Sequence, residues 1–253
     1  MKRSNSIATF VIALIAIFSA GFACNKSETS GGGTPTPPGT PTPGSISKIP
    51  AALKDISGQY DITGTNENGA GNYKGTLEVI ERGEVYQFKW DTAGKKYDGV
   101  GVRTDNSVAV AFTEGENGLG CGVVLYKVGP DGSLDGKAGY WNENSGETEK
   151  GTRTKGSGGV EGEYAITGKR PDGKEYKGTL TIKPEGTGYA FEWNTGGSAL
   201  MGFGIKQGDT MSVGIGGKKC GFVGYEITSD GTLNGKWGGY GSTSVGSETA
   251  KKK

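Results

Sequence analysis

The sequence of 253 residues contains no histidine, and this absence removes several kinds of active site. Histidine is the usual general base, the centre of Ser-His-Asp triads and the commonest metal ligand. Only three cysteines are present, and no CxxC or Cys/His spacing occurs, so we expect no metal site and no cofactor. No pair of repeated carboxylates has a spacing typical of a glycosidase. The sequence therefore predicts a protein that is not an enzyme.

The chain also lacks an excess of charge of either sign and lacks any long segment with helical periodicity. Lys and Arg number 28 against 27 Asp and Glu. A nucleic-acid-binding protein typically has a basic excess, so we expect no nucleic-acid partner. Glycine, in contrast, accounts for 50 residues. This composition favours an all-β chain with many tight turns.

From about residue 56 onward, one sequence of domain size occurs twice. The repeated motifs share glycines, aromatic residues and turns. Gly58-Gln59-Tyr60-Asp61-Ile62 returns as Gly162-Glu163-Tyr164-Ala165-Ile166, Tyr86-Gln87-Phe88-Lys89-Trp90 as Tyr189-Ala190-Phe191-Glu192-Trp193, and Cys121-Gly122 as Cys220-Gly221. A repeat of this length is a domain-sized unit used twice rather than a solenoid of short repeats. We assign repeat 1 to residues 48–155 and repeat 2 to residues 156–250.

Each repeat shows the alternation of polar and apolar residues that predicts β-strands. The expected strands of repeat 1 are near 58–64, 73–81, 85–91, 97–104, 107–113, 121–128, 134–141 and 146–152, with equivalents in repeat 2. Turn signals such as Asn68-Gly69 and Asp131-Gly132 separate these runs. About eight short antiparallel strands per repeat predict two tandem small meander barrels. Lys251-Lys252-Lys253 is expected to be a solvated tail.

The N-terminal residues have the pattern of an export signal. Lys2 and Arg3 precede the apolar residues 7–18, and small residues then lead to Cys24. This pattern predicts a signal peptide over residues 1–23. The Ala23-Cys24 step resembles the cleavage point of bacterial lipoproteins, so we expect lipidation of Cys24, with ordinary cleavage and a free thiol as the alternative. Residues 24–47, rich in Gly, Thr and Pro, are expected to be a disordered linker.

Glycines recur inside one predicted strand of each repeat and need a structural reason. Gly99 and Gly101 alternate with apolar residues, as do Gly202 and Gly204. Strong coiling of the sheet, or an aromatic side chain lying across the strand, is the favoured explanation. The alternative is a bare floor beneath a ligand.

The repeated aromatic residues are the best candidates for ligand binding. The candidates are Tyr73, Trp90, Trp141, Tyr176, Trp193 and Tyr240. The interpretation that the sequence favours, however, is that the aromatic residues of the strands fill the barrels, because a small eight-stranded barrel has room for side chains and little else. Tyrosines at the rim, such as Tyr73 and Tyr176, could instead face a ligand or partner.

Cys121 and Cys220 occupy equivalent positions and leave two possibilities open. A disulfide between them requires the two copies to pack about a pseudo-twofold axis. The alternative, which the sequence favours, is that each is a separate buried thiol. Among the shared acids, Asp131 and Asp230 lie in turns, and Glu147 is matched with Glu248 because a threonine follows each.

The full set of repeat motifs, from Gly-x-Tyr-x-Ile-Thr-Gly to the closing Glu-Thr, resembles a group of exported bacterial proteins labelled fibronectin-binding. The eight-stranded pattern also resembles the avidin and calycin barrels. The first resemblance implies an exported protein with a β-fold. Together with the signal and Cys24, it predicts an envelope lipoprotein, anchored by lipid at the bacterial outer membrane or cell surface. The expected function is non-catalytic binding of a host or extracellular-matrix protein. The alternatives are a carrier of a small apolar or sugar ligand inside each barrel, and a passive envelope component.

Overall fold

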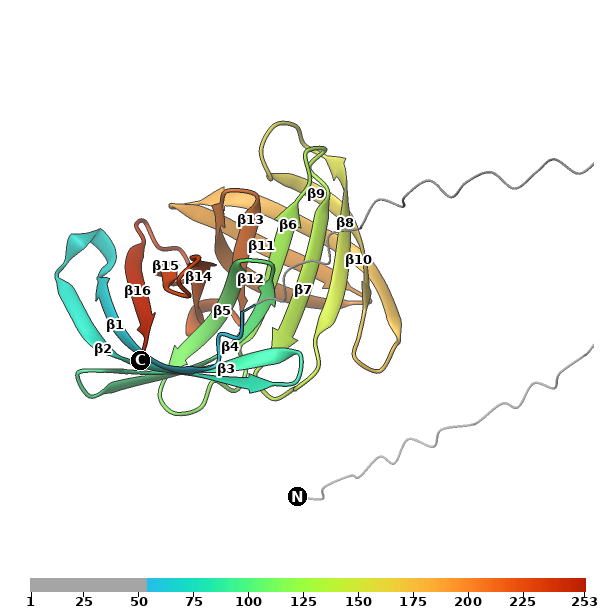
Figure 1. Cartoon of the computed structure of the whole chain (residues 1–253). Coiled ribbons are helices and arrows are strands. Elements are labelled where there is room, and N and C mark those ends of the chain that lie inside the picture. The colour runs from blue at the N-terminus through green and yellow to red at the C-terminus, as the bar shows by residue number, and fades with distance from the viewer. Residues whose placement is uncertain (1–53) are drawn as a thin grey trace, which may run out of the picture. The chain divides into compact units, whose positions relative to one another are not determined.

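The computed structural model describes residues 54–253, which form sixteen β-strands and two short 3-10 turns (Figure 1). The first eight strands are β1 (Gly58–Thr65), β2 (Asn72–Arg82), β3 (Val85–Thr92), β4 (Lys95–Thr104), β5 (Ser107–Glu114), β6 (Gly122–Val128), β7 (Leu134–Tyr140) and β8 (Glu147–Lys155). The next eight are β9 (Gly162–Lys169), β10 (Glu175–Glu185), β11 (Gly188–Thr195), β12 (Ser198–Gln207), β13 (Thr210–Ile215), β14 (Gly221–Ile227), β15 (Leu233–Gly238) and β16 (Gly246–Lys252). The 3-10 turns are η1 (Glu67–Gly69) and η2 (Gly217–Lys219).

The all-β prediction and the prediction of two eight-stranded barrels are confirmed. Every predicted strand of repeat 1 is present, because the alternating side chains place one face of each strand in a core. The predicted lysine tail is partly wrong, since Lys251 and Lys252 belong to β16 and pair with Asp61 and Tyr60. The predicted signal peptide, Cys24 and the linker over 24–47 lie outside the described residues. Within residues 54–253 no helix is both long and apolar enough to cross a membrane.

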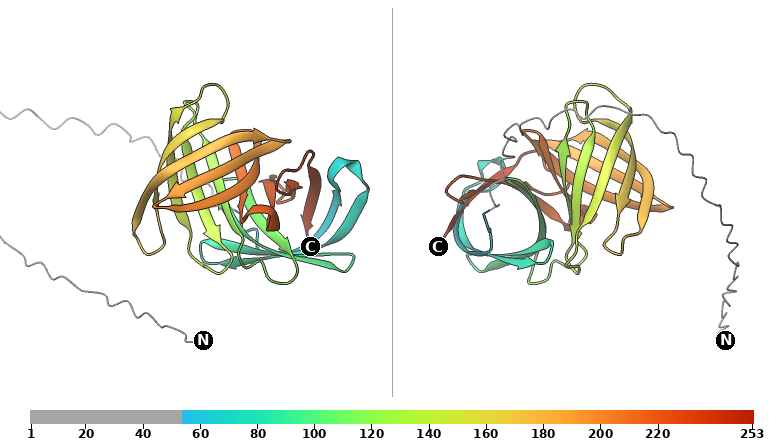
Figure 2. Two further views of the ribbon diagram at one scale, coloured as in Figure 1. Left: turned by 180° about the vertical axis from the view of Figure 1, so that it is seen from behind. Right: turned by 45° about the vertical axis from the view of Figure 1, so that its right-hand side comes forward.

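The two barrels do not coincide with the two sequence repeats. The first barrel joins β1–β5 to β14–β16, and the second consists of β6–β13. In Figure 1 the blue-to-green strands of the first barrel therefore close with the red C-terminal strands, and the right panel of Figure 2 looks into this ring. The second barrel is thus inserted between β5 and β14. The boundary between the repeats, near residue 155, lies inside the second barrel, between β8 and β9.

Part of the interior of each barrel is occupied by a stack of aromatic side chains contributed by both repeats. In the first barrel Phe88 stacks on Trp90 and on Tyr225, with ring centroids 5.6 and 6.1 Å apart. The strand glycines make room for these rings. A Cβ on Gly101 would lie 2.6 Å from the Phe88 ring, and one on Gly202 would lie 2.9 Å from the Trp193 ring. Aromatic side chains lying across the strands therefore account for Gly101 and Gly202.

Between the barrels lies a second apolar layer formed by the outward faces of their strands. It includes Val100 and Val102 of β4, Ala109 and Ala111 of β5, and Val123 and Leu125 of β6, all buried. At Gly139 the side chain of Val85 packs directly on the backbone, since a Cβ on Gly139 would lie 2.7 Å from Cγ1 of Val85. Strands β4 and β5 are consequently buried on both faces.

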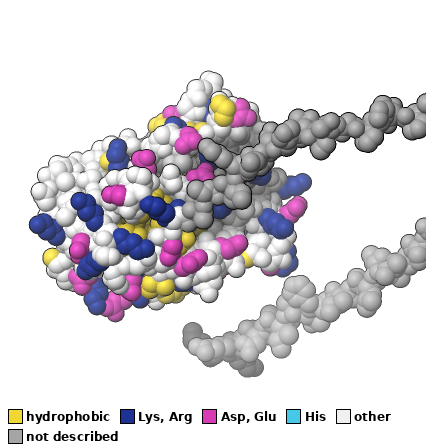
Figure 3. Space-filling view, in the orientation of Figure 1, with side chains coloured by type: hydrophobic (Ala, Val, Ile, Leu, Met, Phe, Trp, Pro, Cys, Tyr) yellow, Lys and Arg dark blue, Asp and Glu magenta, His cyan; other side chains and the backbone are white. Residues whose placement is uncertain are grey.

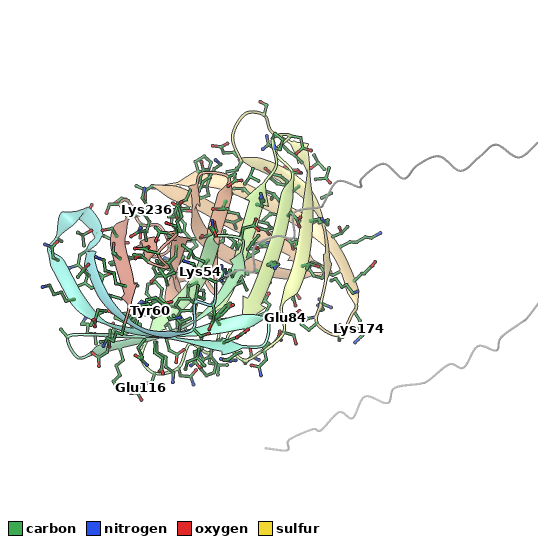
Figure 4. All side chains as sticks on the ribbon, in the orientation of Figure 1. Lys54, Tyr60, Glu84, Glu116, Lys174 and Lys236 are labelled. Carbon is green, nitrogen blue, oxygen red and sulfur yellow. A yellow bond between two sulfur atoms is a disulfide. The ribbon has the colours of Figure 1, made fainter. Side chains whose placement is uncertain are left out.

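Polar contacts surround this apolar layer. Asp98, which is 1% exposed, accepts hydrogen bonds from Gln87 Nε2 at 2.8 Å and Trp141 Nε1 at 2.6 Å. Glu84, labelled in Figure 4, accepts one from the Gly146 N–H at 2.8 Å. Because Gly146 and Trp141 belong to the inserted segment, these bonds tie the β2–β3 hairpin and β4 to the second barrel.

Cys121 and Cys220 form a disulfide with their Cα atoms 5.8 Å apart. Of the two possibilities that the sequence left open, the structure has the disulfide rather than two separate thiols. Cys121 directly precedes β6, the first strand of the inserted barrel, and Cys220 directly precedes β14, the first strand after it, so the disulfide joins the two ends of the insertion. The pairing of Gly122 in β6 with Ile215 in β13 brings these two ends close together.

Candidate functional site

A buried glutamate lies at the centre of the first barrel and accepts three hydrogen bonds. Glu248 on β16 is 5% exposed. Its Oε1 accepts bonds from Trp90 Nε1 at 3.0 Å and from the Tyr225 hydroxyl, and its Oε2 accepts one from the Tyr73 hydroxyl at 2.9 Å. Trp90 and Tyr73 come from repeat 1, whereas Tyr225 and Glu248 come from repeat 2. The network therefore exists only because the first barrel combines strands of both repeats.

The second barrel repeats this arrangement around Glu149 of β8. The Tyr126 hydroxyl and Trp193 Nε1, the latter at 3.2 Å, donate to Glu149 Oε1. The Tyr176 hydroxyl donates to Oε2 at 2.9 Å. Glu149, and not Glu147, is thus the structural counterpart of Glu248. Matching by the following threonine was wrong; the 99-residue separation of the two cysteines, applied to Glu149, leads directly to Glu248.

Burial governs the electrostatics of both networks. Loss of hydration raises the pKa of Glu248 above its ordinary value of 4.5, and the three hydrogen-bond donors act in the opposite direction. The pKa of Glu149 is raised for the same reason. Burial and the neighbouring carboxylate raise the pKa of Tyr225 and of Tyr73, so both hydroxyls remain protonated donors at neutral pH.

The raised pKa gives a prediction for the pH dependence of stability. In wild type, ionisation of Glu248 lowers the stability of the folded state progressively as the pH rises above the unfolded pKa of 4.5, and the full cost is reached above the raised folded pKa. Glu248→Gln removes the titration while its amide oxygen still faces Trp90 and Tyr225 and its N–H donates to the Tyr73 oxygen. We expect the variant to gain stability relative to wild type as the pH rises from 4.5 to 8, measured by thermal unfolding. A difference that is constant over this range would contradict the assignment.

The first barrel contains a cavity of about 320 Å³ beside this network. Five aromatic side chains line it: Tyr73, Trp90, Tyr97, Phe112 and Trp237. They form two groups of neighbouring rings: the ring centroids lie 5.7 Å apart for Trp90–Phe112 and 5.8 Å apart for Tyr97–Phe112 in one group, and 6.3 Å apart for Tyr73–Trp237 in the other.

Polar groups are placed at the two ends of this cavity. Glu248 lies at the buried end, while Asn66, Thr92 and the exposed Lys95 lie at the outer end. Among the described residues that line the cavity, Glu248 is the one carboxylate. A carboxylate has about four lone-pair sites, and three are already occupied. The geometry therefore suits recognition of one donor or cationic group.

The corresponding cavity of the second barrel has only about 80 Å³. Its aromatic wall is incomplete, because Leu200 stands in place of Tyr97, Ile215 in place of Phe112 and Ala138 in place of Trp237. The sheet register establishes these pairs: Phe112 and Ile215, for example, lie opposite the equivalent residues Gly99 and Gly202. Tyr140 and Arg170 also line this smaller cavity. The guanidinium of Arg170 lies over the Tyr176 ring, 5.4 Å from its centroid.

The structure separates the six aromatic candidates into two groups. Tyr73 and Trp90 line the first cavity, and Tyr176 and Trp193 line the second. Trp141 lies at the contact between the barrels, where Arg82 covers its ring at 5.6 Å. Tyr240 packs against Phe203 with ring centroids 5.8 Å apart. Trp141 and Tyr240 are half-buried and belong to neither cavity.

Sequence reasoning matched Glu248 with the wrong glutamate, and it missed Glu149 and three of the five aromatic residues that line the first cavity. Tyr97, Phe112 and Trp237 are aromatic only in the first barrel, so a search for features common to both repeats passes over them. No protein-family model, no curated protein and no solved structure matches this chain. Within residues 54–253 no cluster of three or more His, Cys, Asp or Glu side chains could hold a metal ion.

Proposed function

We propose that this chain is a non-catalytic binding protein whose first barrel holds a small ligand with an apolar body and one hydrogen-bond donor or cationic group. The observation that carries the proposal is the 320 Å³ cavity walled by five aromatic rings, with Glu248 at its buried end. Cavities of about 300–1,000 Å³ with apolar walls and few convergent polar groups are typical of small-molecule sites. The second barrel, with its smaller cavity, supports the fold and the first barrel.

The cellular location proposed for this function is the cell envelope, as the N-terminal sequence predicts. The charged and apolar residues before Cys24 favour export and a lipid anchor at the cell envelope. A ligand carrier held there would collect or present a small molecule at the membrane surface.

Adhesion to a matrix protein receives less support from the side chains. Exposed loop aromatics would favour it, whereas Trp141 and Tyr240 are half-buried in packed clusters. The large exposed hydrophobic residues of the described chain are Leu119, Leu200 and Met201. On the face shown in Figure 3, Lys and Arg are interspersed with Asp and Glu, and apolar side chains form only small patches. We therefore favour the small-ligand function over adhesion.

The test is a ligand screen with matched blocked variants. Thr92→Trp places a large ring at the outer end of the first cavity, and Thr195→Trp does the same in the second, where Thr195 holds the equivalent position. A ligand at 100 times its dissociation constant should stabilise the wild type by about 2.7 kcal/mol. We expect this thermal shift, and a bound mass in native mass spectrometry, for wild type and Thr195→Trp but not for Thr92→Trp. Binding of matrix proteins without any small-molecule binding would replace this proposal with adhesion.

A further inference from the structure

The two barrels consist of equivalent strands, so their cavities can be compared position by position. A side chain that differs between equivalent positions indicates a difference in what the two cavities bind. Both keep the glutamate, the tryptophan and two tyrosines around it. Asn66 and Arg170 are equivalent, because each follows by two residues the glycine that pairs with the network tyrosine, Gly64 with Tyr73 and Gly168 with Tyr176. Each lines the cavity of its own barrel. The mouth of the second barrel thus carries a cation that the mouth of the first barrel lacks at this position.

In the second barrel this cation contacts one tyrosine of the hydrogen-bond network. The Arg170 guanidinium lies over the ring of Tyr176, whose hydroxyl donates to Glu149. A guanidinium within about 6 Å of an aromatic ring is attracted by the electron-rich face of the ring. The second barrel therefore has an internal cation above the tyrosine of this pair, in a cavity that Glu147 also lines. The position equivalent to Glu147 in the first barrel is Gly246, since Glu147 pairs with Ala138 and Gly246 pairs with Trp237. In the first barrel Tyr73 and Glu248 make the same pair, and both line the larger cavity.

The additional side chains of the first barrel suit an external cation. Where the second barrel has Ala138, Leu200 and Ile215, the first has Trp237, Tyr97 and Phe112. All three changes replace an aliphatic side chain by an aromatic one, and tryptophan is the strongest cation–π partner. The buried carboxylate of Glu248 has no cationic partner among the hydrogen bonds that it accepts, so a ligand cation would supply the missing counter-charge.

We propose that the ligand of the first barrel carries a compact organic cation, an ammonium or guanidinium group, and that this group binds among Tyr73, Trp237 and Glu248, where Arg170 lies in the second barrel. This inference rests on the proposed small-ligand function and specifies the chemical class of the ligand. Lys95 at the outer rim is the one cationic side chain lining the cavity, and it is exposed, so solvent screens its repulsion. In the second barrel the equivalent position holds Ser198.

The probes are tetramethylammonium and methylguanidinium chloride, with neopentyl alcohol as a neutral molecule of similar shape, titrated into the disulfide-bonded protein by calorimetry. Both cations should bind at least tenfold more tightly than the alcohol. Glu248→Gln should weaken cation binding at least tenfold, while the matched Glu149→Gln in the second barrel should change it less than twofold. Asn66→Arg, which copies the second barrel, should abolish cation binding, and Lys95→Ser should strengthen it severalfold. Tetramethylammonium does not titrate, so its affinity should fall as the pH is lowered and Glu248 takes up a proton from solution. Other titratable groups near Glu248 are Tyr73, Tyr225 and Lys95.

Several outcomes would overturn the inference. If the alcohol binds as tightly as the cations, the site recognises shape and not charge. If Asn66→Arg leaves cation binding unchanged, the cations do not bind where Arg170 lies in the second barrel. If another small molecule binds the first barrel while both cations do not, the ligand class is wrong and the proposed function stands. If the ligand screen also yields no binder, both the inference and the proposed function fail.

Discussion

Replacing Glu248 with leucine should lower the free energy of unfolding by about 2–6 kcal/mol, although leucine is similar in size and apolar. The carboxylate is the acceptor for Trp90 Nε1 and the Tyr225 hydroxyl, and both donors are enclosed in the core. Leucine leaves both without a partner, at about 1–3 kcal/mol for each buried donor. Tyr73 is half-buried, unlike Trp90 and Tyr225, so water can replace its lost acceptor. Chemical unfolding followed by circular dichroism measures the loss.

A double-variant cycle separates orphaned donors from a general packing defect. Tyr225→Phe removes one of the two donors that Glu248→Leu leaves without an acceptor. The loss of stability caused by Tyr225→Phe should therefore be smaller in the Glu248→Leu background than in wild type. Glu149→Leu in the second barrel provides the matched control, since Glu149 holds Tyr126 and Trp193 in the same way. Costs that simply add in the cycle, or a leucine variant within 1 kcal/mol of wild type, would show that the hydrogen bonds of Glu248 contribute little to stability.

The strands and the aromatic cores follow directly from the sequence, because both depend on patterns that are local and repeated. Tyr86, Phe88 and Trp90 alternate with polar residues, and that alternation alone predicts which side of β3 is buried. The glutamate network did not follow, because Glu149 and Glu248 are preceded by different residues and followed by different ones. Their equal separation from repeated residues, such as Cys121 and Cys220, marks them as a pair.

The partner of β5 could not be read from local patterns. Strands β6 and β14 are near-copies, with Val124 and Tyr126 matching Val223 and Tyr225, so β5 finds similar inward-facing residues on either strand. The sequence nevertheless contains a sign of the observed arrangement. In β5 both faces are apolar, with Val108 and Val110 on one and Ala109 and Ala111 on the other. A strand of this kind needs cover on both sides, which the contact between the two barrels provides.

The disulfide should contribute most to the second barrel. Cys121→Ala combined with Cys220→Ala should lower its free energy of unfolding by about 4–5 kcal/mol, because the bond closes a loop spanning 99 residues in the unfolded chain. Alanine is preferable to serine here, since Cys121 lies in a buried apolar cluster. Guanidinium unfolding with and without a thiol reductant measures the effect, and the reductant should change the midpoint of wild type but not of the double variant.

The first barrel should respond to this change only through the second. While the second barrel is folded, the pairing of β6 with β13 already holds the ends of the insertion together, so the first barrel gains little from the bond. Once the second barrel unfolds, β5 and β14 are joined by a long open loop and their pairing becomes entropically costly. In the double variant we therefore expect the second barrel to unfold first, with the first barrel following at the same or slightly higher denaturant. Trp193 emission reports the second barrel, and Trp90 and Trp237 report the first. Loss of the first barrel before the second would show that the disulfide acts on the closure of β5 with β14 and not on the inserted barrel.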